Sequence, residues 1–462
     1  MSKAVPGNPG ENKMGVLPVG RLLFTMAVPM MVSMLFQALY NVVDSVFVAR
    51  LGQDALNAVS LAFPLQNLMI GVGSGTALGM NALLSRSLGE KKQDVVDRSA
   101  NTGIFLSLCS AAAFAVIGLG FSRVFFRTLT ENPNIISYGS AYTGICLGLS
   151  VGVFCQFCFE RMLQATGRTA LSMVTQLTGA IINIILDPIM IFGLFGMPRM
   201  EVAGAAAATV IGQIIAASLA LLFNRFFNPD VHLHIHQIRW HTQTAREIYR
   251  IGVPSILMMS VGSVMNFFLN RILISFTEAA TAVFGAYFKL QSFIFMPVFG
   301  LNNGMVPIVA YNYGAAKPER MKETIRLAVK SAICIMSVGF LIFQLFPGVL
   351  LGFFDPSPEM REIGNVTLRL ISLCFPIAGF CVVAGSVCQA IGNPFYTLVI
   401  AVCRQLVVLL PTAWLLSLTG RLSLVWLSFV IAEGASMALS FVFLRRTLRA
   451  ADESFRARGV EP

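Results

Sequence analysis

Charged side chains are scarce in this chain. Asp, Glu, Lys and Arg make up 12% of its 462 residues, against about a quarter in an ordinary soluble protein. Histidine is also rare, because there are four and all lie between 232 and 241. What remains is 56% hydrophobic, with a mean hydropathy of +0.75. This composition excludes a soluble globular domain and predicts a membrane protein.

The nine cysteines all fall inside long apolar stretches. Cys155 and Cys158 have the spacing of a redox or metal-binding pair, but Phe154, Phe157 and Phe159 surround them. We therefore interpret the cysteines as small buried hydrophobic residues.

Twelve apolar stretches are long enough to cross a bilayer, which takes about 20 helical residues. Their interiors do not alternate between polar and apolar residues, so helices are favoured over barrel strands. The first stretch is too long for a cleavable signal peptide, so none is expected. The predicted fold class is all-α integral membrane, with twelve transmembrane helices. They lie near 22–48, 57–83, 99–122, 137–159, 170–195, 202–224, 251–275, 281–310, 327–352, 366–388, 395–417 and 422–444.

The chain aligns with itself at a single offset of 225 residues. The matched pairs include Pro29 and Pro254, Asn41 and Asn266, Gly75 and Gly300, and Gln164 and Gln389. Six spans per repeat is an even number, so both repeats enter the membrane in the same direction. We therefore predict two six-helix lobes related by a pseudo-two-fold axis along the membrane normal. The expected domains are an N-lobe at 1–224, a cytoplasmic linker at 225–250 and a C-lobe at 251–462 with a basic C-terminal tail.

Basic residues divide unequally between alternate connections. The set that includes both termini carries 23 Lys and Arg, and the opposite set carries eight. By the positive-inside rule this places both termini in the cytoplasm, and the chain in the plasma membrane. The net charge of +11 is thus a topology signal, and no nucleic-acid partner is expected. The His-x-His-x-His pattern of the linker could bind a metal, but a solvated connector is the favoured interpretation.

Five in-span ionisable residues have no counterpart in the other repeat. Such residues cost at least a few kcal/mol each inside a bilayer, so they usually face a cavity or a partner. The pairs are Asp44 and Leu269, Asp187 and Thr412, Lys289 and Pro64, Arg404 and Gly179, and Glu433 and Ala208.

The two N-lobe acids are predicted to lie at similar depth. Asn183 shares a helix face with Asp187, and Thr209 enters from the next span. Desolvation and mutual repulsion favour a proton on one carboxyl, so the pair could take up a proton on one side and release it on the other. The same oxygens could instead coordinate Na⁺. Purely structural hydrogen bonding is a third interpretation.

Other polar positions have weaker assignments. Gln37, Tyr40 and Asn41 extend a polar stripe from Asp44, and they are candidates for contact with a substrate. Lys289 and Glu433 form either a C-lobe ion pair or a substrate contact. We expect Arg404 to reach the cytoplasmic surface.

Several segments together resemble multidrug and toxic compound extrusion (MATE) transporters. They are Asn41-Val-Val-Asp44-Ser-Val-Phe-Val-Ala-Arg-Leu51-Gly52 with Pro29 and Gln37 before it, Asn81-Ala-Leu-Leu-Ser-Arg86-Ser-Leu-Gly89, Gln164-Ala-Thr-Gly167 and Tyr311-Asn-Tyr-Gly314. The resemblance covers residues from about 15 to 450 and implies the two-lobe, twelve-span plan of that family.

The resemblance also implies roles for individual residues. In the branch similar to the DNA-damage-inducible-F (DinF) proteins, a cation site lies in the N-lobe, and its positions match Asp44, Asn183, Asp187 and Thr209. Members bend the first span near the position of Pro29. A different branch uses acids in spans 7 and 10 for Na⁺, and this chain has none at 366–388.

The function expected on this basis is a cation-coupled antiporter, with H⁺ favoured over Na⁺, that exports amphipathic cationic or aromatic compounds by alternating access. No cofactor, no resident metal and no enzymatic activity are expected. The partners expected are small organic substrates and membrane lipid, and the protein is expected to be monomeric. A lipid-linked precursor flippase is the alternative, and an integral-membrane transferase a remote one. The flippase needs several cavity bases, and the transferase needs acids or histidines clustered at a membrane face.

Overall fold

The computed structural model describes residues 12–233 and 238–460. Every regular element in these ranges is a helix. The first half contains α1 (Lys13–Val16), α2 (Val19–Ala49), α3 (Gln53–Gly89), α4 (Gln93–Leu129), α5 (Pro133–Gly148), α6 (Val151–Ala165), α7 (Thr169–Phe192), η1 (Leu194–Gly196) and α8 (Val202–Phe227). The second contains α9 (Thr242–Ile274), α10 (Glu278–Gly314), α11 (Pro318–Leu345), α12 (Pro347–Gly352), α13 (Pro358–Ser372), α14 (Phe375–Ile391), α15 (Pro394–Val402), the π-helix η3 (Cys403–Leu409), α16 (Leu410–Ser417), α17 (Leu422–Val425) and α18 (Leu427–Ala457).

Ten helical segments within these ranges are long and apolar enough to cross a membrane. Two bent pairs bring the number to twelve if each pair is one span, α5 with α6 at 43° and α13 with α14 at 49°. The predicted all-α membrane fold with twelve spans is thus confirmed.

The helices repeat at the offset seen in the sequence. Both ends of α3 lie 225 residues before those of α10, and α7 begins 225 residues before α15. The correspondence fails within one span, because α7 is continuous where its counterpart contains the π-helix η3.

The chain forms two compact units, one of residues 32–256 and the other of residues 1–31 with 257–462. Both divisions fall inside helices, in α2 and α9, two residues after Pro29 and Pro254. The units therefore divide the chain at other positions than the predicted lobes, whose boundaries stay a prediction.

Glycines explain why the first turns of α9 belong with residues 32–256. A Cβ on Gly75 of α3 would lie 2.9 Å from the carbonyl oxygen of Gly252 on α9. In the other unit, a Cβ on Gly304 of α10 would lie 2.7 Å from the Cα of Ala27 on α2. Such backbone contact between helices is available only where side chains are absent or small.

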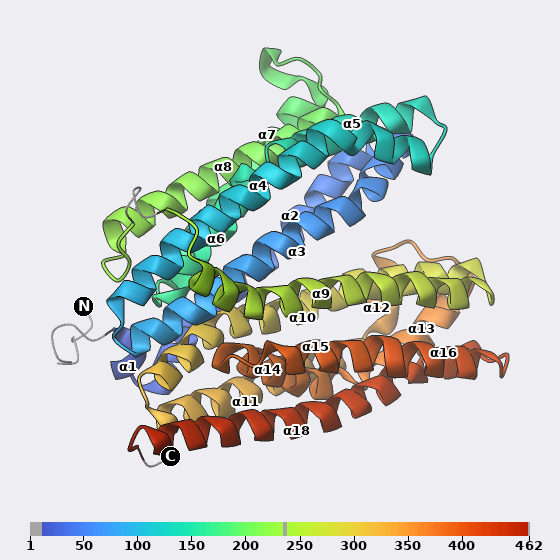
Figure 1. Cartoon of the computed structure of the whole chain (residues 1–462). Helices are drawn as coiled ribbons and strands as arrows, with labels where there is room; N and C mark the ends of the chain where they lie inside the picture. Colours follow the sequence, from blue (N-terminus) through green and yellow to red (C-terminus); the bar gives the residue numbers. More distant parts are fainter. Residues whose placement is uncertain (1–11, 234–237, 461–462) are drawn as a thin grey trace. The chain divides into compact units, whose positions relative to one another are not determined.

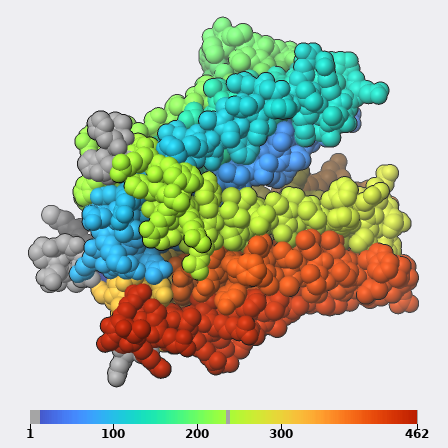
Figure 2. Space-filling view, in the orientation of Figure 1, coloured from blue at the N-terminus to red at the C-terminus, as the bar shows by residue number. Residues whose placement is uncertain are grey.

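The start of the chain is fixed to its own unit by side chains that donate to backbone carbonyls. Arg320 on α11 donates to Leu17 at 2.6 Å and to Met14 at 3.2 Å, and Lys317 donates to Gly15 at 3.0 Å. These bonds satisfy carbonyls of the short helix α1 that lack partners within it. In the same unit α18, drawn in red, lies on the surface (Figure 2).

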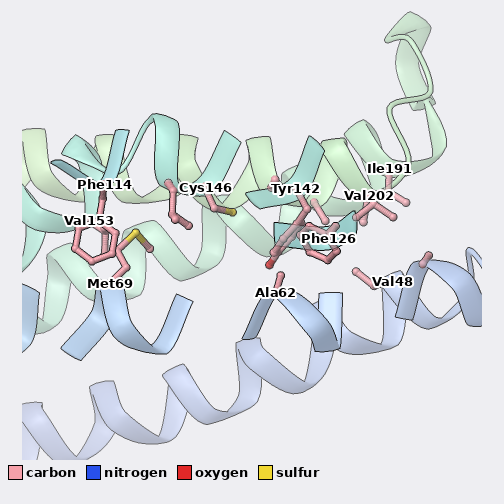
Figure 3. Packing of buried hydrophobic residues seen from close by; sticks show 14 of the residues in the cluster. Val48, Ala62, Met69, Phe114, Phe126, Tyr142, Cys146, Val153, Ile191 and Val202 are labelled. Carbon is pink, nitrogen blue, oxygen red and sulfur yellow. The ribbon is translucent and has the colours of Figure 1, made fainter. Parts of the chain in front are cut away.

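A buried apolar cluster in the unit of residues 32–256 lies against the candidate site. Figure 3 shows Val48, Ile191 and Val202 at one end of this cluster and Phe114 and Val153 at the other. The ends of α2, α7 and α8 are thereby packed together, which fixes the polar residues one or two turns away.

Candidate ion-coupling site

The centre of the site is the pair of helices α7 and α8, which lie side by side (Figure 1). They approach closely, because a Cβ on Gly179 would lie 3.1 Å from the carbonyl oxygen of Gly212. We expected irregular backbone where Asp187 precedes Pro188, but α7 continues through Pro188 to Phe192. Pro188 lacks only the N–H that would bond the carbonyl one turn earlier. Asp187 is therefore presented from a helix.

The amide of Asn183 joins the two helices. Its nitrogen donates to Asp187 Oδ2 at 3.3 Å, and its oxygen accepts from the hydroxyl and the backbone N–H of Thr209, each at 3.1 Å. Asp187 is fully buried, and Asn183 is 3% exposed. Each polar atom of the amide thus has a partner suited to it.

Asp44 reaches this group from α2. Its carboxyl group is in hydrogen-bond contact with that of Asp187. Two carboxyl groups can share a hydrogen bond only when one of them carries a proton. The contact is held nearby by Phe47 and Phe192, whose rings meet edge to face at 6.4 Å. Asp44 Oδ1 is buried and has no hydrogen-bond partner.

The structure therefore brings Asp44, Asn183, Asp187 and Thr209 together. Their coupling role stays a prediction, as does contact of Gln37, Tyr40 and Asn41 with a substrate. Gln37 and Asn41 are exposed on their unit, and Tyr40 is half-buried. A polar face therefore continues from Asp44 along α2.

Two further side chains near the acids were missed in the sequence. Gln66 on α3 donates to the hydroxyl of Tyr142 on α5 at 3.1 Å, and Tyr142 lies within electrostatic range of Asp44. Figure 3 places Tyr142 in the apolar cluster beside Cys146. Gln66 was recognised only as a repeated position shared with Gln291, and shared positions suggest scaffold.

A buried acid on α6 was also missed. Glu160 is 4% exposed and accepts hydrogen bonds from Gln156 and Gln176 at 2.9 Å each and from Thr175 at 3.1 Å. Its counterpart is Gly385, so the comparison of the repeats contains the signal. It was lost because the predicted span ended at 159, whereas α6 continues to Ala165.

The acid of the C-lobe has a different partner from the one considered in the sequence. Glu433 Oε2 accepts from Arg404 Nη1 at 3.4 Å, whereas Lys289 is exposed on its unit. Arg404 therefore does not extend to the cytoplasmic surface as expected. It pairs with Glu433 because both lie on neighbouring helices at one level.

Pro29, the predicted hinge, lies inside the continuous helix α2. The chain passes from one compact unit to the other between Met31 and Val32, just beyond it. Proline in a helix removes one backbone hydrogen bond and is a frequent cause of bending.

The linker histidines have separate surroundings. His232 contacts Asp97 Oδ2 at 3.2 Å through its ring and Asp97 Oδ1 at 2.9 Å through its backbone N–H. His241 accepts from Arg239 at 3.3 Å, and His234 and His236 lie outside the described residues. In residues 12–233 and 238–460, no three His, Cys, Asp or Glu are grouped so as to hold a metal.

Comparison with known families finds the repeat independently. The sequence model of the family described as MatE matches the chain twice, at residues 29–189 and 254–415. The two matches begin at Pro29 and Pro254.

Two curated relatives align over most of their length. The chain is 27% identical over 431 residues to the "Multidrug export protein MepA" of Staphylococcus haemolyticus, which covers 93% of this chain and 94% of that protein. It is 26% identical over 406 residues to the "FAD transporter" of Shewanella oneidensis, which covers 86% and 88%. Among solved structures, the outward-facing conformation of a multidrug resistance MATE family transporter superposes with a TM-score of 0.90 at 22% identity, over 97% of this chain and 100% of that one.

Proposed function

Because the chain belongs to the MatE family and is a multi-pass membrane transporter rather than an enzyme, we propose that it exports amphipathic cationic or aromatic compounds in exchange for protons. The observation that carries this proposal is the contact between the Asp44 and Asp187 carboxyl groups. Multidrug export is named for one of the relatives.

The surroundings of the two acids favour H⁺ over Na⁺. A sodium ion would need several free oxygen ligands. The oxygen of Asn183 is already engaged by Thr209, and the Asn183 nitrogen points at Asp187. A shared proton, in contrast, satisfies both carboxyl groups without further ligands.

Coupling requires that the proton and the substrate influence each other's binding. Loss of the proton leaves two facing carboxylates, whose repulsion separates α2 from α7. Separation changes the polar face of α2 that carries Gln37, Tyr40 and Asn41, and it bends the helix near Pro29. A change in substrate affinity caused by the proton implies an equal and opposite effect of substrate on proton binding.

The same proposal includes the placement of the protein. It lies in the plasma membrane as a monomer with both termini in the cytoplasm, since the basic residues predominate on that side. The branch similar to the DinF proteins is favoured by its N-lobe acids and by the lack of an acid at 366–388.

Efflux of ethidium from cells that express the chain tests the proposal. Efflux should collapse on addition of a protonophore and in Asp44→Asn, and it should persist when Na⁺ is replaced by choline. Leu269→Asn, at the matching C-lobe position, is the control for a polar substitution at this depth. Full efflux by Asp44→Asn would remove Asp44 from the mechanism.

The same cells decide between the activities named for the two relatives. Export of FAD without export of ethidium would contradict the proposed substrate class and favour the activity of the Shewanella relative.

A further inference from the structure

The ion pair between Arg404 and Glu433 is unusual in its geometry. It uses a single guanidinium nitrogen at 3.4 Å, whereas a strong arginine–carboxylate pair uses two nitrogens at about 2.8 Å. The Arg404 side chain is 27% exposed and that of Glu433 is 7% exposed. Arg404 therefore covers a nearly buried carboxylate without binding it tightly.

Beneath Arg404 is a group of oxygens without hydrogen-bond partners. They are Glu433 Oε1 and the hydroxyls of Ser436 and Ser440, which follow on one face of α18. Both serines are fully buried, and the thiol of Cys381 faces all three side chains. Buried polar atoms are rarely left unpaired in proteins, so this group indicates a ligand that supplies hydrogen-bond donors.

The backbone beside the pair is also irregular. Arg404 lies in the π-helix η3, whereas the matching segment of α7 is an ordinary α-helix. Single π turns inside α-helices are frequent at functional sites. The extra backbone room allows the Arg404 side chain to move without breaking the span.

The charges select the chemistry of the ligand. A simple cation at Glu433 would leave Arg404 unpaired, and a simple anion at Arg404 would leave Glu433 unpaired, and each is costly in a membrane span. A zwitterion replaces both partners at once and leaves no uncompensated charge.

An aromatic surface adjoins the pair. Phe429 lies one turn before Glu433 on α18, and its ring contacts those of Tyr287 at 6.2 Å and Phe284 at 6.0 Å. Phe429 is half-buried, which leaves part of this surface open to a planar ring.

We propose that Arg404 and Glu433 form a substrate subsite for an amphipathic aromatic zwitterion, with the ligand carboxylate on Arg404 and its protonated amine on Glu433. The inference rests on the proposed export function and specifies one substrate class for it.

Binding of three related probes to the purified full chain in lipid nanodiscs tests the subsite. Norfloxacin is a zwitterion at neutral pH, its methyl ester is a cation, and its N-acetyl derivative is an anion. Wild type should bind norfloxacin about tenfold more tightly than either derivative, because only norfloxacin pairs with both charges.

The variants should separate the two contacts. Arg404→Gln should weaken norfloxacin about tenfold and leave the ester as tight or tighter, because the carboxylate of Glu433 is then free. Glu433→Gln should weaken norfloxacin and the ester but not the N-acetyl derivative. The double variant, which leaves no lone buried charge to disturb folding, should bind the three probes alike.

An equal change for all three probes in every variant, or no change in any, would overturn the subsite. Ethidium efflux by the wild type keeps this outcome distinct from failure of the proposed function. Proton-dependent efflux with uniform probe responses removes only the subsite. Absence of efflux removes the proposed function, and the probe pattern still decides whether the ion pair binds zwitterions.

Discussion

The helices α7 and α8 and their counterparts in the second repeat show what one scaffold can hold. In the first repeat they present Asp187 with Asn183 and Thr209, without a basic side chain among them. In the second, the matching helices present Arg404 and Glu433 as an ion pair. The difference teaches that the ionisable residues diverged while the span ends kept their offset.

The strongest way to break this difference is to remove the N-lobe charge. Asp187→Asn should reduce energised ethidium efflux to background, a loss of at least about tenfold, because a carboxyl in a membrane span is retained for function. Thr412→Asn, at the matching position, is the control and should export normally. Equal losses in both variants would mean that the position matters only for packing.

The second prediction concerns the ion pair. Glu433→Ala should lower the free energy of unfolding by about 2 kcal/mol, because Arg404 loses its partner while it is largely buried. Thermal unfolding in detergent measures this. The double variant Arg404→Ala/Glu433→Ala should recover most of the loss, and a double variant as unstable as the single one would show that the charge is not the cause.

The two prolines offer a third test, in which only one proline is followed by an in-span acid. Pro29→Ala should slow efflux about threefold or more, because it restores a backbone hydrogen bond in α2 and opposes bending before Asp44. Pro254→Ala should have a smaller effect, since the position matching Asp44 is Leu269. A larger effect of Pro254→Ala would reverse the assignment of the hinge.

The smallest effect is expected at Glu160. Glu160→Gln replaces one acceptor oxygen by a donor that would face other donors, so stability should fall by about 1 to 2 kcal/mol. Glu160→Ala removes all three hydrogen bonds and should be less stable still. If both variants unfold with the wild type, the bonds at Glu160 do not contribute measurably.

Much of the fold could be predicted because the repeat and the apolar spans are properties of the sequence itself. The site was predictable in part, since Asp44 and Asp187 are charges that the other repeat lacks. Glu160 has the same signature but lay one residue beyond a predicted span end, where a charge is unremarkable. The Arg404–Glu433 pair was missed because depth along a helix does not determine which neighbour a flexible arginine meets. The π-helix leaves no pattern in hydrophobic periodicity that could reveal it.

Proton movement in proteoliposomes tests the central claim that Asp44 and Asp187 exchange a proton for substrate. The purified chain is reconstituted with a pH indicator inside, and ethidium is added in a sodium-free medium. The account predicts ethidium-dependent proton movement in the wild type, unchanged by added Na⁺ and absent in Asp44→Asn and Asp187→Asn. Ethidium transport that requires Na⁺, or proton movement that persists in both variants, would contradict it.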